Sequence, residues 1–276
     1  MCDPGRALYE DIGATTRVTG ARVRGPVSWN GVAVSAALDL VAEKIEAAGA
    51  ATAFLATPQA TNEDLFAFRT LADAARGKLD FRVGNPQDKV RRRIDEVLQR
   101  ADRNPNTQGC LDQGLGRDGV DAVLEACRGG QVQALVLQGP ELLRVAEIVD
   151  AVAKVPFVAV MATHEGPELD RAQVVLPAAL WAEVDGTFTN YQRRIQRVKA
   201  AVPAPGDAAP RWELTAGLLE RLGAPLGATS AREILVALAE ATSGYEGLDF
   251  RGVGAQGRAL SLDGEAAAST PEEVRA

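Results

Sequence analysis

The only candidate for a catalytic histidine is His164, which lies in Thr163-His164-Glu165 just after a predicted strand. A serine or cysteine nucleophile needs a histidine that a carboxylate orients, and open α/β sheets bind ligands at the carboxyl ends of their strands. A lone histidine beside an exposed glutamate is nevertheless more often a solvated loop residue. We favour that interpretation and assign no catalytic residue.

The cysteines offer little metal or disulfide chemistry. The chain has Cys2, Cys110 and Cys127, at unrelated spacings and without a Cys-x-x-Cys pair. With one histidine, this set does not match the ligand spacing of a zinc site or a disulfide framework. Free cysteine packs as a small apolar residue, so Cys110 and Cys127 are predicted to fill the core.

Two basic clusters have the side chains to bind anions. One covers residues 89–93, and the other contains Arg193, Arg194, Arg197 and Lys199. The first is interpreted as a solvated helix face. The second is either an anion pocket, because arginine forks suit phosphate, or a docking surface for an acidic partner subunit. We prefer the docking surface.

A series of short motifs shows a family resemblance. Residues 173–177 read Gln-Val-Val-Leu-Pro, residues 183–190 read Glu-Val-Asp-Gly-Thr-Phe-Thr-Asn, and residues 194–197 read Arg-Ile-Gln-Arg. Together they resemble the signature loop of the molybdopterin oxidoreductase superfamily, which lies beside the pterin cofactor. Residues 2–6, 101–109, 203–208 and 212–215 resemble further blocks in the same order. The order is most similar to the molybdopterin-like C-terminal domain in the large iron–sulfur subunit of NADH:quinone oxidoreductase (respiratory complex I).

The resemblance implies site residues. Asn190, Arg194 and Gln196 correspond to the pterin loop, and Cys2 stands where a ligand of a 4Fe–4S cluster would be. The first three cysteine ligands are absent, and Arg193 replaces a glycine that allows close backbone approach to a ligand. We therefore expect no bound cofactor, only relic sites for molybdopterin and the cluster.

The leading functional hypothesis is a non-catalytic accessory subunit in the peripheral arm of an NADH:quinone oxidoreductase. It would support electron transfer through clusters on other subunits and would not be catalytic alone. The alternative is a fragment of a split molybdopterin oxidoreductase of formate dehydrogenase type, which binds cofactor together with another chain. Asn190 and Gln196 favour this alternative. A nucleotide-binding α/β protein is a third possibility, which rests on fold analogy alone.

Composition limits the class of partner. Among 276 residues the net charge is −7, with both signs interspersed, whereas nucleic-acid binding requires a concentrated basic face. The sequence shows no apolar run long enough to span a bilayer and no signal-peptide pattern. We expect a cytoplasmic protein held on the inner membrane through partner subunits, without direct insertion.

Alternating strands and helices must position these residues. The pattern requires parallel pairing through right-handed crossovers and predicts an α/β fold: a Rossmann-like open, mainly parallel sheet flanked by helices, similar to formate dehydrogenase and DMSO reductase, with a short β-rich N-terminal lead-in. Strands are expected at 51–57, 79–83, 132–138, 157–162 and 174–176. Helices are expected from Ser35 to Gly49, from Thr61 or Asn62 to Gly77, from Asp118 or Asp121 to Gly129, and at 141–154, 209–222 and 230–242.

We predict three segments. Residues 1–30 form the edge of an iron–sulfur domain and an extended lead-in, and residues 31–242 form the molybdopterin oxidoreductase-like domain, with a possible break near 101–117. Residues 243–276 have few large apolar residues and are expected to form a loosely ordered tail. Alternatively, Tyr245, Leu248 and Phe250 anchor this tail on the domain.

Overall fold

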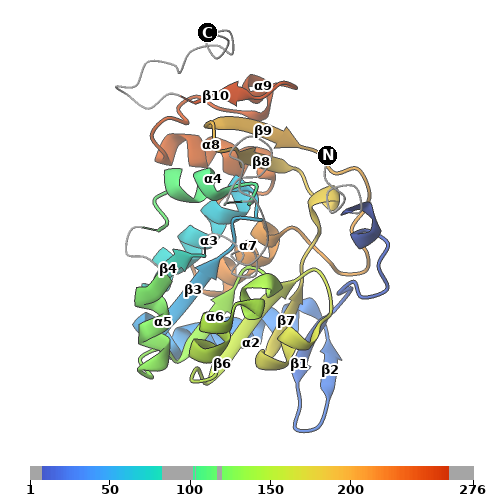
Figure 1. Ribbon diagram of the computed structural model, residues 1–276, viewed down its shortest axis with the longest axis vertical. Helices are drawn as coiled ribbons and strands as arrows, with labels where there is room; N and C mark the ends of the chain where they lie inside the picture. The colour runs from blue at the N-terminus through green and yellow to red at the C-terminus, as the bar shows by residue number, and fades with distance from the viewer. Residues whose placement is uncertain (1–7, 83–101, 103, 117–119, 261–276) are drawn as a thin grey trace, which may run out of the picture.

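The computed structural model describes residues 8–82, 102, 104–116 and 120–260. Its main feature is a seven-stranded sheet in the order β2-β1-β7-β6-β5-β3-β4 (Figure 1). Strands β4, β3, β5, β6 and β7 pair in parallel in that order. Strands β1 and β2 are added antiparallel beyond β7. The predicted mainly parallel sheet with a short β-rich lead-in is confirmed. The strands are β1 (Ala21–Arg24), β2 (Trp29–Val32), β3 (Thr52–Ala56), β4 (Lys78–Phe81), β5 (Ala134–Leu137), β6 (Phe157–Ala162) and β7 (Val174–Pro177).

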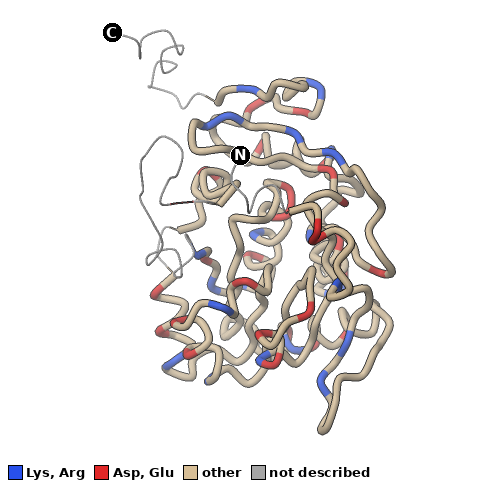
Figure 2. Tube along the Cα trace, turned by 45° about the vertical axis from the view of Figure 1, so that its right-hand side comes forward, with Lys and Arg blue, Asp and Glu red and all other residues tan. Residues whose placement is uncertain are grey.

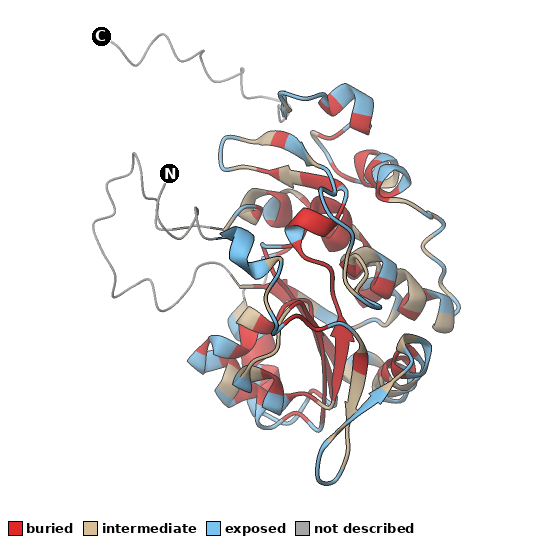
Figure 3. Cartoon of the chain, turned by 90° about the vertical axis from the view of Figure 1, so that its right-hand side faces the viewer, coloured by how far each residue is buried: buried red, intermediate tan, exposed pale blue. Residues whose placement is uncertain are grey.

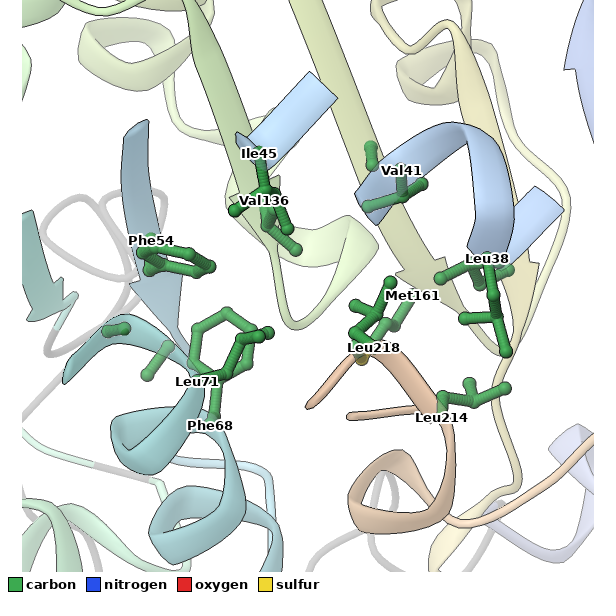
Figure 4. Packing of buried hydrophobic residues seen from close by; sticks show 14 of the residues in the cluster. Leu38, Val41, Ile45, Phe54, Phe68, Leu71, Val136, Met161, Leu214 and Leu218 are labelled. Carbon is green, nitrogen blue, oxygen red and sulfur yellow. The ribbon is translucent and has the colours of Figure 1, made fainter. Parts of the chain in front are cut away.

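Helices cover both faces of this sheet. Phe54 and Val136 point to the face that α2, α3 and α7 cover (Figure 4), whereas Leu55 and Leu135 point to α5 and α6. The central strands are therefore buried on both sides (Figure 3), which explains their continuous apolar sequences. The helices are α2 (Val34–Ala48), α3 (Asn62–Ala74), α4 (Thr107–Asp112), α5 (Val120–Arg128), α6 (Ala146–Val152), α7 (Arg211–Arg221), α8 (Ala231–Ala241) and α9 (Phe250–Val253).

Helix ends follow local capping chemistry. Thr61 caps α3 in a capping box, in which its hydroxyl accepts from the Asp64 N–H and the Asp64 carboxylate accepts from the Thr61 N–H. Gly49 ends α2 with a positive φ, as predicted, because glycine tolerates this conformation. The N-cap of α2 is Ala33 rather than Ser35, with no side-chain hydrogen bond.

The predicted helix 141–154 is divided in two. Residues Pro140–Arg144 form a 3-10 turn, Val145 is extended, and α6 begins only at Ala146. A proline at the start and a β-branched residue that prefers extended backbone explain the break.

A second, three-stranded sheet lies at the far end of the molecule. It contains β8 (Gly186–Thr189), β9 (Arg194–Val198) and β10 (Arg258–Ala259), in the antiparallel order β10-β9-β8 (Figure 1). Behind it, Ile195 packs with α8 and with Tyr245, Leu248 and Phe250. These last three residues are buried, as in the anchored alternative for the C-terminal segment. The division of the chain into three segments stays a prediction.

Surface charge and hydropathy give two further observations. Figure 2 shows acidic and basic residues interspersed along the described chain. None of the helices in the part that the structure describes is long and apolar enough to cross a bilayer. Association with a membrane through other subunits remains a prediction.

Candidate functional site

The signature loop starts where β7 ends and contributes the β8–β9 hairpin. Polar residues follow the parallel strands at this edge: Thr57 after β3, Gln138 after β5 and Thr163 after β6. Gln138 accepts from the Thr57 N–H through its Oε1 and donates through Nε2 to the Asp64 carbonyl. The carboxyl edge of the sheet is thus joined to the start of α3. Ligands bind at this edge in open α/β folds.

Thr187 of β8 is bonded to a buried carboxyl group on α3. Its N–H donates to Glu63 Oε2 at 2.8 Å and its hydroxyl donates to Oε1 at 2.9 Å. Glu63 is fully buried, and no lysine or arginine pairs with it in the described part of the chain. Burial raises the pKa of Glu63 to about 8. A carboxyl group with this pKa is mostly protonated at pH 7.

Thr189 joins three other segments. Asn62 at the start of α3 donates to its hydroxyl at 3.0 Å, and Tyr245 is hydrogen-bonded to the same hydroxyl at 2.6 Å. The Thr189 N–H donates to Asn106 Oδ1 at 2.8 Å, while Asn106 Nδ2 donates to the Ala60 carbonyl. All four side chains that meet here are buried. They form a polar network that fixes the position of β8.

A buried ion pair holds the beginning of the loop. The guanidinium of Arg17 contacts both oxygens of Glu183, at 2.5 and 2.7 Å, and the two side chains are 4% and 1% exposed. Arg17 also donates to the Thr163 carbonyl, and Glu183 accepts from the Leu180 N–H. Because both partners have further hydrogen bonds, the cost of burying the charges is offset.

The motif at 101–109 packs against the signature loop through its last residues. A Cβ atom on Gly109 would overlap Asn62 Oδ1 and Asn106 Oδ1. Only glycine leaves room for these two amides, which hold Thr189. The blocks at 101–109 and 183–190, which are far apart in the sequence, therefore meet in one network.

The three residues assigned to the cofactor loop lie close together: Asn190 begins the β8–β9 turn, and Arg194 and Gln196 lie at the start of β9. Asn190 Oδ1 accepts from the backbone N–H groups of Gln192 and Arg194, and its Nδ2 lies 3.4 Å from Gln196 Oε1. Arg194 Nη1 donates to the Gly257 carbonyl at 3.0 Å. Gln196 is exposed. Part of their hydrogen-bonding capacity is used within the hairpin itself, and their assignment to a cofactor stays a prediction.

Arg193, where the resembled family has glycine, keeps the backbone conformation that glycine favours. Its φ is +55°, in the left-handed region. Its guanidinium contacts Asp112 Oδ1 of α4 at 2.9 Å. Residue 193 thus retains the turn and adds an ion pair.

The other sequence candidates have structural partners. His164 contacts Thr163 Oγ1 and the Asp11 carbonyl through its two ring nitrogens, and Glu165 pairs with Arg22 rather than with the histidine. Cys110 and Cys127 are buried as predicted. Burial raises the pKa of Cys127 to about 11 and that of Cys110 well above its ordinary value, so neither is an activated thiolate.

Two sequence candidates fall outside the described residues, namely Cys2 and the basic cluster at 89–93. Within residues 8–82, 102, 104–116 and 120–260, no group of three or more histidine, cysteine or acidic side chains is placed to hold a metal ion.

The structure adds features that the sequence did not assign to a site. An open hollow of about 790 Å³ lies beside β9 and the start of α8, where Arg197 stacks over Phe250 at 4.3 Å. Asn62, Glu63 and Tyr245 were also missed. Polar residues in a first helical turn are ordinary capping residues, so Asn62 and Glu63 gave no distinct signal.

A comparison with family models supports the resemblance seen in the signature loop. Residues 98–221 match the family model described as "Molybdopterin oxidoreductase". The solved structure of "Acetylene Hydratase from Pelobacter acetylenicus" aligns with 95% of this chain and 69% of its own, with a TM-score of 0.54 and 9% identity. At that identity the likeness concerns the fold alone. The molybdopterin oxidoreductase family is thus supported for this chain, and its DMSO reductase-like α/β fold is consistent with that.

The individual relatives are formate dehydrogenase subunits. The chain is 50% identical over 88 residues to F420-dependent formate dehydrogenase 2 subunit alpha of Methanococcus maripaludis, a match that covers 31% of this chain and 13% of that protein. It is 30% identical over 154 residues to F420-dependent formate dehydrogenase 1 subunit alpha of the same organism, covering 54% and 23%. The matched segment is thus less than a quarter of either relative.

Two expectations change as a result. The family resemblance is supported over residues 98–221, but these relatives are formate dehydrogenases and do not point to the complex I subunit specifically. The expectation that no cofactor binds is wrong, because the chain matches a molybdopterin family and its formate dehydrogenase members.

Proposed function

We propose that this chain is the α/β part of a molybdopterin oxidoreductase of formate dehydrogenase type, which binds one side of the cofactor while further polypeptide completes the site. The 50% identity over 88 residues to a formate dehydrogenase alpha subunit carries this proposal. The geometry supports it, because the signature hairpin is held at the carboxyl edge of the sheet by a buried network that involves Glu63 and Thr189.

Asn190, Arg194 and Gln196 are the residues proposed to hold the cofactor. Gln196 is exposed, and Arg194 uses Nη1 for the Gly257 carbonyl, so the rest of its guanidinium can face a ligand. Amide and guanidinium groups suit the ring edges and phosphates of a pterin nucleotide. When bound, the cofactor supplies the metal centre that takes electrons from the substrate. The side chains of this chain orient the pterin by hydrogen bonds.

Formate is the substrate proposed for the whole assembly, because the two relatives are named for it. Both are named as alpha subunits, which favours partner subunits here as well. The remaining wall of the site would come from such a partner or from another part of the same polypeptide.

The second candidate function is an accessory subunit of a respiratory NADH:quinone oxidoreductase. In that case the β8–β9 loop would mainly stabilise the fold and form part of a subunit interface. One observation favours it: the Asn190 side-chain oxygen accepts hydrogen bonds from two backbone N–H groups of its own hairpin, which is a structural role. Peripheral attachment to a membrane belongs to this candidate.

Purification from the native source separates the two candidates. The tagged chain is isolated in mild detergent, co-purifying proteins are identified by mass spectrometry, and molybdenum, tungsten and oxidised pterin are measured. Pterin and metal with formate dehydrogenase subunits are expected. Recovery with flavin, iron–sulfur and membrane subunits of an NADH:quinone oxidoreductase would favour the second candidate instead.

The proposed residues are tested in the same complex. Gln196→Ala is expected to reduce pterin content several-fold with an unchanged melting temperature, because Gln196 is exposed and contributes little to the core. Gln192→Ala is the matched control, since its exposed side chain lies in the same turn and only its backbone N–H contacts Asn190. Equal pterin content in both variants would remove Gln196 from the site.

A further inference from the structure

Arg193 occupies a backbone conformation that costs energy for a residue with a side chain. Its φ of +55° lies in the left-handed region, which only glycine and a few small polar residues adopt readily. Such a conformation persists only when the surroundings hold it. The contacts of the Arg193 side chain therefore need explanation.

A chain of polar contacts runs from this turn back to β8. Arg193 pairs with Asp112 Oδ1, and Asp112 Oδ2 accepts from the Tyr245 hydroxyl at 3.2 Å. Tyr245 is in turn hydrogen-bonded to Thr189, one residue before the loop that starts at Asn190. The turn between β8 and β9 is thus tied to α4 and to the C-terminal segment at both of its ends.

In the ion pair between Arg193 and Asp112, the Asp112 side chain is protected from solvent. The Asp112 side chain is 3% exposed and also accepts from Gln108 Nε2 at 2.7 Å, while Arg193 is 30% exposed. A second pair in the same hairpin provides a contrast. Arg197 and Asp185 are 3.6 Å apart with side chains 29% and 50% exposed, so solvent screens that pair and it contributes little.

We propose that Arg193 is a positioning residue. Through Asp112 and Tyr245 it holds the turn between β8 and β9 in place, as a clamp, so that Asn190, Arg194 and Gln196 are presented to a pterin cofactor. The inference rests on the proposed function for the identity of the ligand, but the clamp itself is a property of the chain. A glycine at this position would form the turn without fixing it. Arginine forms it and attaches it to the core.

Hydrogen exchange measured by mass spectrometry tests the clamp without cofactor. The reporters are the Asn190 N–H, which donates to the Arg194 carbonyl, and the Arg194 N–H, which donates to Asn190 Oδ1. In Arg193→Gly and Asp112→Asn the 190–196 peptide is expected to exchange about tenfold faster, as follows from losing one charge-assisted hydrogen bond. Arg193→Lys should restore part of the protection.

Asp185→Asn is the matched control, since it removes the charge from the exposed pair of the same hairpin. Exchange unchanged from wild type in both Arg193→Gly and Asp112→Asn, or equally faster in Asp185→Asn, would overturn the clamp. Using two variants on opposite sides of the pair guards against one of them failing to fold. Urea unfolding of each variant checks that the fold is intact.

The link to the ligand is a separate measurement. In the native complex, Arg193→Gly is expected to lower pterin content several-fold and Arg193→Lys to restore part of it. If wild-type complex contains no pterin while the exchange effect is present, the proposed function fails and the clamp stands. If pterin is present but its content is the same in Arg193→Gly, the clamp does not serve the cofactor.

Discussion

At the scale of single residues, the main feature is a buried carboxyl group that has no cationic partner among the residues that the structure describes. Glu63 accepts two hydrogen bonds from Thr187, and burial raises its pKa to about 8. In the unfolded chain its pKa is about 4.5. Between these values the folded protein holds a proton that the unfolded chain has released. The contribution of Glu63 to the free energy of unfolding therefore falls as pH rises from about 4.5 to 8.

Glu63→Gln is expected to remove this part of the pH dependence. The amide keeps the shape but cannot ionise. Its oxygen can accept from the Thr187 N–H, while its NH2 group would donate to the Thr187 hydroxyl instead of accepting from it. The variant should therefore be more stable than wild type at pH 8 by on the order of 1–3 kcal/mol. Urea unfolding at pH 5 and pH 8 measures the difference. The same slope with pH in both proteins would show that Glu63 is ionised in the folded state at pH 7.

Gly109→Ala tests the room beside the two buried amides. The added methyl group overlaps Asn62 and Asn106 and should displace the hydrogen bond to Thr189, at a cost of about 2 kcal/mol or more. Gly31→Ala is a suitable control, because a Cβ there meets no atom within 4 Å. If the two variants unfold at the same urea concentration, the packing at Gly109 is looser than these contacts indicate.

At the scale of elements, a buried ion pair holds the N-terminal segment to the signature loop. Arg17 and Glu183 are both almost fully buried, and they lie before β1 and after β7. Removing one partner leaves an uncompensated charge in the interior. Glu183 is the last residue of η6 (Trp181–Glu183), just before β8, so the ion pair joins this turn to the N-terminal segment.

Glu183→Ala is accordingly expected to lower the free energy of unfolding by about 3 kcal/mol or more. Asp170→Ala, which removes the partner of Arg24 at a side chain 72% exposed, should change it by less than about 1 kcal/mol. Thermal or urea unfolding distinguishes the two. Similar small losses in both variants would mean that Arg17 finds another partner.

Sequence patterns predicted individual elements well where the cause is local. The Thr61 cap, the glycine end of α2 and the apolar strand β6 depend on neighbouring residues, and all three are observed. The helix predicted at 141–154 is longer than the observed one. The apolar pattern continues on both sides of Val145, but the backbone at Val145 is extended and interrupts the helix.

The composition of the site was predictable only in part. The loop containing Asn190, Arg194 and Gln196 was recognised from its motif. Its attachment to Glu63 and Tyr245 was not, because contacts between residues far apart in the chain follow from tertiary packing and leave no periodic signal. Tyr245 was considered only as a possible anchor, and its hydrogen bond to Thr189 was not foreseen.

At the scale of the whole molecule, the two sheets differ in how they are buried. The large sheet has apolar clusters on both faces, whereas β10 consists of two exposed residues and β9 has one buried residue, Ile195. Local stability follows the number of buried apolar contacts. Strands β9 and β10 should therefore open before the large sheet does.

Native-state hydrogen exchange is expected to show this difference. Amides of β5 and β6 should exchange slowest, through global unfolding, and those of β9 and β10 should exchange faster, through local opening. Uniform protection across both sheets would instead show one cooperative unit. Wild type suffices for this measurement.

The antiparallel hairpin β1–β2 has a consequence for how the protein behaves in solution. Its strand β1 pairs with β7, whose residues Val174, Val175 and Leu176 are completely buried. If that hairpin were cut away or displaced, a row of unpaired peptide groups flanked by apolar side chains would face water. An exposed edge strand of this kind can pair with strands of other molecules. The hairpin therefore also protects the edge of the sheet against polymerisation. Deletion or displacement of the hairpin should produce insoluble protein before it changes the candidate functional site.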